Sequence, residues 1–155
     1  MLSIAFSPDG TLLASGSRSH SRASSENKPL QIWELLTGDL RHAFGGDSDS
    51  VESVAFSPDN QFLAAIWPER RALQILDLKT GNLLQTLEEH SSDSIAFSPD
   101  GRLLGSSGLE TTKLWNLETG KLQQTLKRSS LSIAFSPDSR LLASGSSDSN
   151  EASGI

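Results

Sequence analysis

The chain of 155 residues contains no cysteine. Disulfide bonds and thiolate metal sites are therefore excluded, and this composition suits an intracellular protein, which we expect to be cytoplasmic. No apolar stretch approaches the roughly 20 residues that a membrane-spanning helix needs. The first residues have neither the basic start nor the apolar core of a signal peptide. We therefore expect no association with a membrane.

Positive charge is also scarce. The formal net charge is -6, from 13 basic and 19 acidic side chains, and neither sign forms a long run. A nucleic-acid surface is expected to be basic, so we expect no nucleic-acid partner. The sequence also lacks the Gly-x-x-x-x-Gly-Lys-Ser/Thr loop that binds nucleotide phosphates.

Histidine occurs only three times, as His20, His42 and His90, at widely separated positions. Nucleophilic catalysis needs a base close to its nucleophile, and a zinc site needs several closely spaced ligands. We therefore expect no enzyme activity, no metal and no cofactor.

Short internal repeats dominate the sequence, as a search for self-similarity shows. The segment Leu2–Asp9 is identical to Leu131–Asp138. Two further motifs recur at intervals of 38 to 50 residues: Ala-Phe-Ser-Pro-Asp begins at residues 5, 55, 96 and 134, and Leu-x-Thr-Gly-x-Leu begins at residues 35, 78 and 117. The chain therefore consists of three complete copies and one partial copy of a unit of about 40 residues.

Each complete copy reads as four short strands separated by turn residues. In the first copy the expected strands are 2–7, 12–17, 30–35 and 39–44, and the second copy is expected to begin with a strand at 51–57. Ile4 and Phe6 are two residues apart, so they share one face of the first strand. The first turn is Pro-Asp followed by Gly, Asn or Ser, and the third position favours a residue that accepts positive φ. Ser139 is the least favourable residue at that position.

The motifs Phe-Ser-Pro-Asp-Gly, Leu-Leu-Ala-Ser-Gly-Ser and Leu-Gln-Ile-Trp-Glu together resemble the WD40 repeat. The likeness extends to the self-similar WD40 arrays of signalling NTPases. Another propeller repeat, found in periplasmic translocation and peptidase proteins, shares only the first motif. The resemblance implies an all-β, WD40-type β-propeller arc of four-stranded antiparallel blades, incomplete at about 3.5 blades. The whole chain, 1–155, would form one repeat region. The blades would be 1–50, 51–92, 93–130 and the half blade 131–155.

The resemblance also implies a structural Asp-His-Ser-Trp hydrogen-bond network within blades. Its matching residues here are Trp33, Trp115, His90 and Asp148. No single blade contains the full set, because His90 is the only match to the Gly-His motif and Asp148 lies in the partial copy.

The connectors between strands differ in how much their length varies. Connectors one to three join the four strands of a copy in order, and connector four leads to the next copy. Connectors one and three are nearly constant in length and lie at one end of a meander. Connectors two and four vary in length and lie together at the other end. Variable loops on a rigid scaffold often carry binding, and Arg and aromatic side chains are favoured interface anchors. The candidate partner-binding residues at that end are Arg18, His20, Arg22, Trp67, Arg70, Arg71, His90 and Arg128. The alternative is a set of solvated loops, with Trp67 packed into its blade.

The expected function is a non-catalytic scaffold for protein–protein interaction that forms part of a WD40 propeller. The alternative is a truncated remnant of a larger WD40 protein, without independent function. A propeller hydrolase remains a distant third possibility, after the interaction scaffold and the truncated remnant. The expected partners are other proteins, or further WD40 blades of this or another chain. Residues 148–155 end before a third strand of the last copy, so we expect a fragment with open edges that self-associates.

Overall fold

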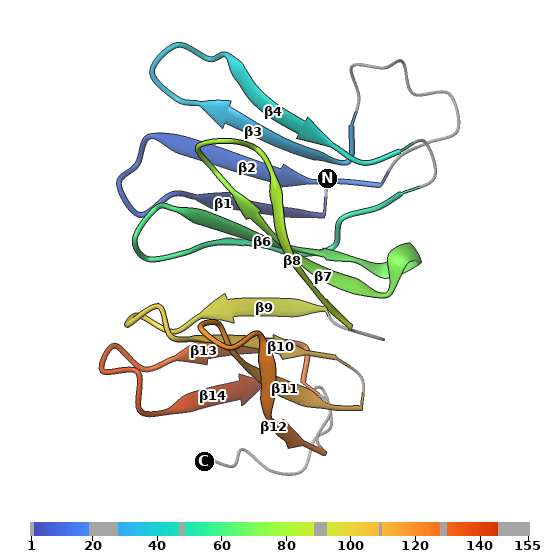
Figure 1. The fold of residues 1–155 in the computed structure, drawn as a ribbon, viewed down its shortest axis with the longest axis vertical. Coiled ribbons are helices and arrows are strands. Elements are labelled where there is room, and N and C mark those ends of the chain that lie inside the picture. The colour runs from blue at the N-terminus through green and yellow to red at the C-terminus, as the bar shows by residue number, and fades with distance from the viewer. Residues whose placement is uncertain are drawn as a thin grey trace. The chain divides into compact units, whose positions relative to one another are not determined.

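The computed structural model describes residues 2–18, 28–46, 49–88, 93–108, 110–127 and 130–145. In these ranges the chain forms three four-stranded sheets and one two-stranded sheet (Figure 1), and each strand pairs antiparallel with its sequence neighbour. The sheets follow the repeats, and we call them blades 1 to 4. No helix in the described ranges is long and apolar enough to cross a membrane.

The strands have the following bounds. Blade 1 contains β1 (Ser3–Phe6), β2 (Leu12–Gly16), β3 (Leu30–Glu34) and β4 (Leu40–Phe44). Blade 2 contains β5 (Val54–Phe56), β6 (Phe62–Trp67), the 3-10 turn η1 (Pro68–Arg70), β7 (Ala72–Asp77) and β8 (Leu83–Glu88). Blade 3 contains β9 (Ser94–Phe97), β10 (Leu103–Ser107), β11 (Thr112–Asn116) and β12 (Lys121–Leu126). Blade 4 contains β13 (Ser132–Phe135) and β14 (Leu142–Gly145).

The expected strand order is confirmed, with bounds that differ by a few residues. The largest difference is the first strand of blade 2, expected from Val51 and observed from Val54. The preceding residues connect to two blades instead. The Val51 N–H donates to the Ser17 carbonyl at 2.9 Å, and the Glu52 N–H donates to the Ile66 carbonyl at 3.2 Å. Val51 and Glu52 thus join the end of β2 to β6.

The first turn of every blade is built by the same pair of side chains. The serine hydroxyl donates to the aspartate carboxylate and accepts the backbone N–H of the residue five positions after the serine. The Ser–Asp contacts are Ser7–Asp9 (2.6 Å), Ser57–Asp59 (2.5 Å), Ser98–Asp100 (2.6 Å) and Ser136–Asp138 (2.6 Å). The Ser-Pro-Asp motif recurs because it closes this turn.

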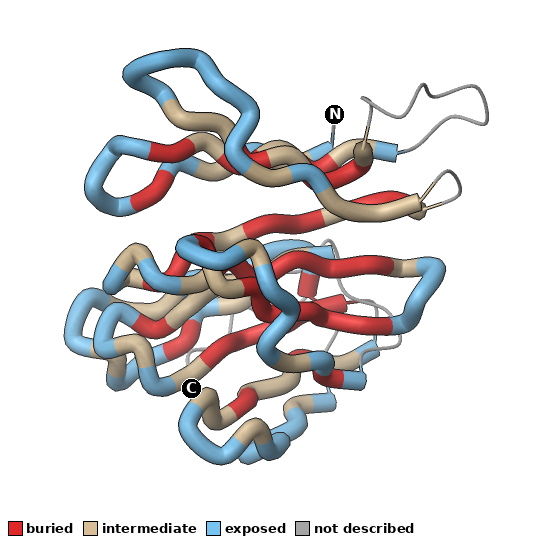
Figure 2. The backbone as a smooth tube through the Cα atoms, turned by 45° about the horizontal axis from the view of Figure 1, so that its top comes forward, coloured by how far each residue is buried: buried red, intermediate tan, exposed pale blue. Residues whose placement is uncertain are grey.

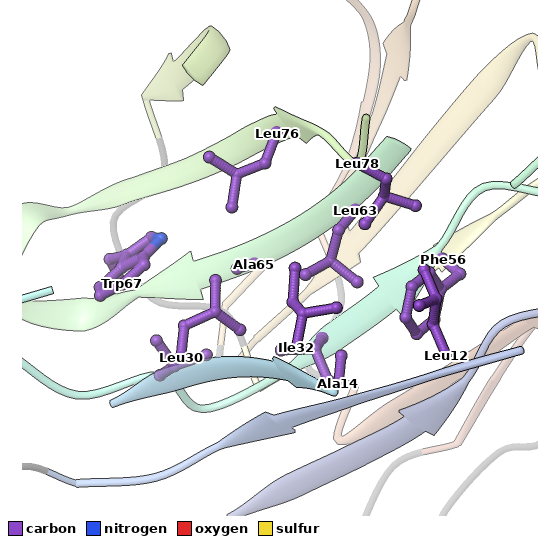
Figure 3. Packing of buried hydrophobic residues seen from close by; sticks show 12 residues of the cluster. Leu12, Ala14, Leu30, Ile32, Phe56, Leu63, Ala65, Trp67, Leu76 and Leu78 are labelled. Atoms are coloured by element: carbon purple, nitrogen blue, oxygen red, sulfur yellow. The ribbon is translucent and has the colours of Figure 1, made fainter. Parts of the chain in front are cut away.

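Two compact units divide the chain, Met1–His90 and Ser91–Ile155. In the first unit, the main core lies between blades 1 and 2 (Figure 3). Leu30 and Ile32 of β3 face Leu63 and Trp67 of β6 there. In the second unit, β13 packs against β9 and β10 of blade 3. Buried residues are concentrated on inner strands such as β2, β6 and β10, whereas the turns and the fourth strands β4, β8 and β12 are largely exposed (Figure 2).

Candidate protein-interaction surface

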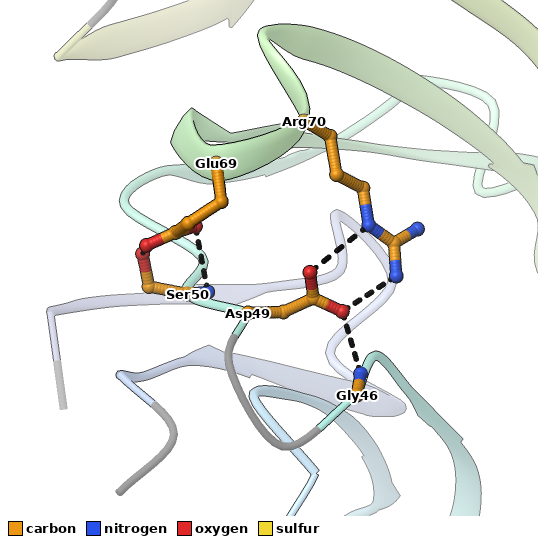
Figure 4. A network of polar contacts seen from close by, with 5 residues as sticks. All are labelled: Gly46, Asp49, Ser50, Glu69 and Arg70. Atoms are coloured by element: carbon orange, nitrogen blue, oxygen red, sulfur yellow. Dashed lines mark hydrogen bonds and ion pairs between the residues drawn. The ribbon is translucent and has the colours of Figure 1, made fainter.

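One variable connector of blade 1, residues 45–50, and one of blade 2, residues 68–71, meet in a polar cluster (Figure 4). Arg70 in η1 reaches Asp49, in connector four of blade 1, through two nitrogens. Its Nε donates to Oδ1 at 3.2 Å and its Nη2 to Oδ2 at 2.6 Å. The Gly46 N–H also donates to Asp49 Oδ2, at 2.5 Å. This bidentate pairing of the guanidinium with the carboxylate holds the guanidinium in one orientation.

A second carboxylate of η1 binds the same connector. The Ser50 N–H donates to Glu69 Oε2 at 2.9 Å, and the Ser50 hydroxyl donates to Oε1 at 2.6 Å. Ser50 is itself bridged to Arg18 at the end of β2. Connector four of blade 1, connector two of blade 2 and the end of β2 therefore lie together. The expectation that the variable connectors share one end is confirmed for connector four of blade 1 and connector two of blade 2, while residues 19–27 and 89–92 of the other two connectors lie outside the described residues.

The carboxylates in this cluster are stabilised as anions. The hydrogen bond from Arg70 is the main cause that lowers the pKa of Asp49. Partial burial works toward a higher pKa for Glu69, but the hydrogen bonds from Ser50 and from the Glu69 backbone outweigh it, so the pKa is lowered. Both groups are thus ionised at neutral pH.

The position of Trp67 contradicts its predicted role as an exposed partner-binding residue. Its side chain is 1% exposed and belongs to the core between blades 1 and 2 (Figure 3). A Cβ added to Gly45 would come within 2.9 Å of Trp67 Cζ3, so connector four of blade 1 covers the indole closely. The Arg70 guanidinium lies 4.5 Å from the ring centroid. Trp67 therefore cannot serve as an exposed anchor in this structure, and the alternative, packing into its blade, is the one observed.

The remaining described candidates are exposed at the same end. Arg71 ends η1 in the left-handed conformation, with φ 50°, and its N–H donates to the Pro68 carbonyl. Arg18 forms a long ion pair with Glu52, with Nη2 and Oε1 3.8 Å apart. Four other predicted residues lie outside the described residues: His20, Arg22, His90 and Arg128.

The residues of the expected structural network are only partly placed. In blade 3 the Trp115 indole N–H donates to the Ser106 hydroxyl at 3.2 Å, which is the Trp–Ser link of that network. Trp33 occupies the matching position on β3 and is half-buried. His90 and Asp148 lie outside the described residues. In blade 2 the matching pair is Leu76 and Ala65, which are both buried.

A feature that the sequence did not suggest lies at the opposite end of blades 1 and 2, where the constant turns meet. A depression of about 370 Å³ opens there. Its lining includes two acidic and two basic side chains, from the turns, from β4 and from the end of β7: Asp9, Asp77, Arg41 and Lys79. The inter-blade bond from the Asp9 N–H to Asn60 Oδ1, at 3.2 Å, borders it. Because the turns at this end have nearly constant length, loop variation does not mark it as a site.

Known proteins resemble this chain in fold and in sequence. Hydrazine synthase of Kuenenia stuttgartiensis superposes on 92% of the chain and 41% of its own, with a TM-score of 0.75. At 16% identity this likeness shows the fold alone. The protein tipD of Dictyostelium discoideum is 27% identical over 79% of the chain, and the WD repeat-containing protein SL1-17 of Schistosoma mansoni is 36% identical over 41%. The chain spans 19% of the length of each of these two relatives.

The family model of the WD domain, G-beta repeat, matches four segments of the chain, at residues 1–21, 38–65, 81–116 and 120–150. These segments cover more than half of the sequence and include strands from all four blades. Repeats of this kind serve in general as modules for protein–protein interaction. The chain belongs to the WD40 repeat family and has the fold of its β-propeller blades.

Proposed function

We propose that this chain is a non-catalytic section of a WD40 propeller that binds partner proteins through the variable-connector end of blades 1 and 2. The observation that carries the proposal is the rigid polar cluster around Asp49 and Arg70. It fixes connectors from two blades in one surface, and rigid presentation lowers the entropy lost on binding. We further propose an intracellular setting, in keeping with the cysteine-free sequence.

Two features support a binding role for this end. Arg71 and Arg18 are exposed beside the cluster, and arginine is enriched among residues that contribute most to interface affinity. The carboxylates of Asp49 and Glu69 are already occupied by Arg70 and Ser50. The cluster therefore acts as support, while the exposed side chains of Arg71 and of Arg18, which also pairs with Glu52, offer donors to an acidic partner surface. His42, one of the three histidines, has its Nε2 3.1 Å from the Leu78 carbonyl, which suits a structural role.

Affinity capture with charge-reversal variants tests this proposal. The variant Arg18→Glu/Arg71→Glu should lose at least tenfold of the partner recovered by the unaltered chain, because both exposed donors become acceptors. Recovery is measured by quantitative mass spectrometry against a bead-only sample. Circular dichroism of each variant confirms that the blades remain folded.

Arg102→Glu is the matched control, because Arg102 is an exposed arginine in a constant turn at the other end of blade 3. It should leave recovery unchanged. Equal loss in both variants would point to a general charge effect, and unchanged recovery in the double variant would remove the variable-connector end as the binding surface.

A further inference from the structure

Two segments of identical sequence occupy opposite environments in this chain. Leu2–Asp9 equals Leu131–Asp138, and the Leu-Leu-Ala-Ser-Gly-Ser that follows is the same at 12–17 and at 141–146. The first pair of segments carries β1 and β13, and the second pair carries β2 and β14. Because the local sequence is the same, any difference in burial comes from the neighbouring blade.

In blade 4 the apolar side chains of the first strand, β13, pack against the neighbouring blade 3. Ile133 of β13 is 7% exposed and packs on blade 3, where a Cβ added to Gly105 would lie 2.9 Å from Ile133 Cδ1 and 3.4 Å from Phe135 Cε2. In blade 1 the equivalent Ile4 and Phe6 are 51% and 62% exposed. The front face of blade 1, defined by Leu2, Ile4 and Phe6, is therefore an apolar surface of a kind that packs on a blade elsewhere in the same chain.

Blade 1 shows what the second strand does when it has a neighbour. Leu12 is 5% exposed and Ala14 is fully buried against blade 2. A Cβ on Gly16 would lie 2.8 Å from the Val51 carbonyl oxygen, whereas one on the equivalent Gly145 would meet nothing closer than 3.9 Å. In blade 4 the equivalent Leu141 is 56% exposed, and Ala143 and Gly145 are exposed. We call this surface, Leu141, Ala143 and Gly145, the rear face of blade 4.

We propose that the front face of blade 1 binds the rear face of blade 4 in a second copy of this chain. The two faces are chemically complementary because the same residues form the packed interfaces within each unit. The front face supplies an Ile-x-Phe ridge, and the rear face supplies a Leu-x-Ala-x-Gly hollow that receives such a ridge in blade 1. The contact joins two different surfaces, so it is heterologous, head to tail. This self-association is separate from partner binding at the variable connectors.

Mixing two face variants tests the proposal. Phe6→Asp places a charge on the front face and Leu141→Asp places one on the rear face, and both side chains are exposed, so each chain should fold. Light scattering coupled to size exclusion should show the unaltered chain gaining mass with concentration. Each variant alone should elute as a monomer. An equimolar mixture should form a species of twice the monomer mass, because one intact front face and one intact rear face remain.

Leu36→Asp is the control, since Leu36 is an exposed leucine in the hairpin turn after β3. It should associate like the unaltered chain. Both face variants gain the same negative charge, so attraction between new charges cannot explain rescue in the mixture. The proposal is overturned if the unaltered chain stays monomeric, if Phe6→Asp or Leu141→Asp alone still associates, or if the mixture remains monomeric.

Discussion

At the scale of residues, the two buried tryptophans of this chain differ in what their indole nitrogens bind. Trp115 donates to the Ser106 hydroxyl, whereas the buried Nε1 of Trp67 has no hydrogen-bond partner among the described residues. Each ring also carries a cation above it, Lys113 at 5.7 Å and Arg70 at 4.5 Å. Trp67 thus contributes by apolar packing and by its contact with Arg70, and Trp115 adds a hydrogen bond inside its blade.

This difference predicts unequal costs for the same substitution. Trp67→Phe removes an unpaired buried donor together with some volume, whereas Trp115→Phe removes a hydrogen bond. We expect Trp115→Phe to lower the free energy of unfolding by about 1 kcal/mol more than Trp67→Phe does. Urea denaturation of the two variants measures the difference. Equal losses, or a larger loss at Trp67, would contradict the roles assigned to the two nitrogens.

The Asp49 carboxyl makes the contribution of this polar cluster to folding stability depend on pH. Its pKa in the folded chain is lowered below the unfolded value of about 3.9, so its ionised form stabilises the fold above that pH. The contribution is lost as pH falls through the folded pKa. Asp49→Asn should therefore reduce stability at pH 7 by about 0.5–1 kcal/mol, because Arg70 is partly exposed and the pair is screened.

The gap between Asp49→Asn and the unaltered chain should narrow below about pH 4, where the carboxyl of the unaltered chain also becomes neutral. Thermal melting at several pH values down to about 3 follows this gap. Glu118→Gln, which neutralises an exposed carboxylate in a hairpin turn of blade 3, serves as control. A gap that persists unchanged at low pH would show that the Asp49 charge is not what the substitution removes.

At the scale of elements, the Ser-Pro-Asp turn is the unit that repeats most faithfully. In blade 1 the Ser7 hydroxyl accepts the Leu12 N–H at 2.8 Å in a buried setting. The same bond in blade 4, from the Leu141 N–H to Ser136 at 2.9 Å, is exposed. The two turns share Ser-Pro-Asp and the following Leu and differ at two positions, Gly10-Thr11 against Ser139-Arg140, so they form a closely related pair.

Ser7→Ala should therefore cost more than Ser136→Ala. The first substitution leaves a buried N–H without a partner, at about 1–3 kcal/mol, while water replaces the hydroxyl in the second. Urea unfolding of both variants gives the comparison. A loss at Ser136 equal to that at Ser7 would mean that burial by blade 2 does not govern the strength of this turn.

The sequence predicted the elements well because turn chemistry and strand alternation are local. Ser139 is an example: it stands where other copies have Gly or Asn, and it adopts φ 61°. Its hydroxyl also accepts the Asp100 N–H at 3.0 Å, and no local pattern predicts such an inter-blade bond. Trp67 was misplaced for the same reason. Aligned with Ser17 at a strand end, it resembles a loop residue, and only packing against blade 1 buries it.

At the scale of the whole molecule, the repeated sequence determines what each face offers, and the neighbouring blade decides whether it is buried. Ile4 and Ile133 lie in identical eight-residue segments, yet Ile4 is 51% exposed and Ile133 is 7% exposed. The family follows from the motifs alone. The binding surface does not, because the Asp49–Arg70 contact joins residues from two blades that no sequence pattern pairs.

Site-specific photo-crosslinking tests the central claim, binding at the variable-connector end, most directly. A photoreactive amino acid replaces Arg71 beside the cluster, and in a second chain it replaces Arg102 in a constant turn. The account predicts covalent adducts to partner proteins from position 71 that are absent or at least tenfold weaker from position 102. Adducts of equal yield from both positions, or from position 102 alone, would contradict it.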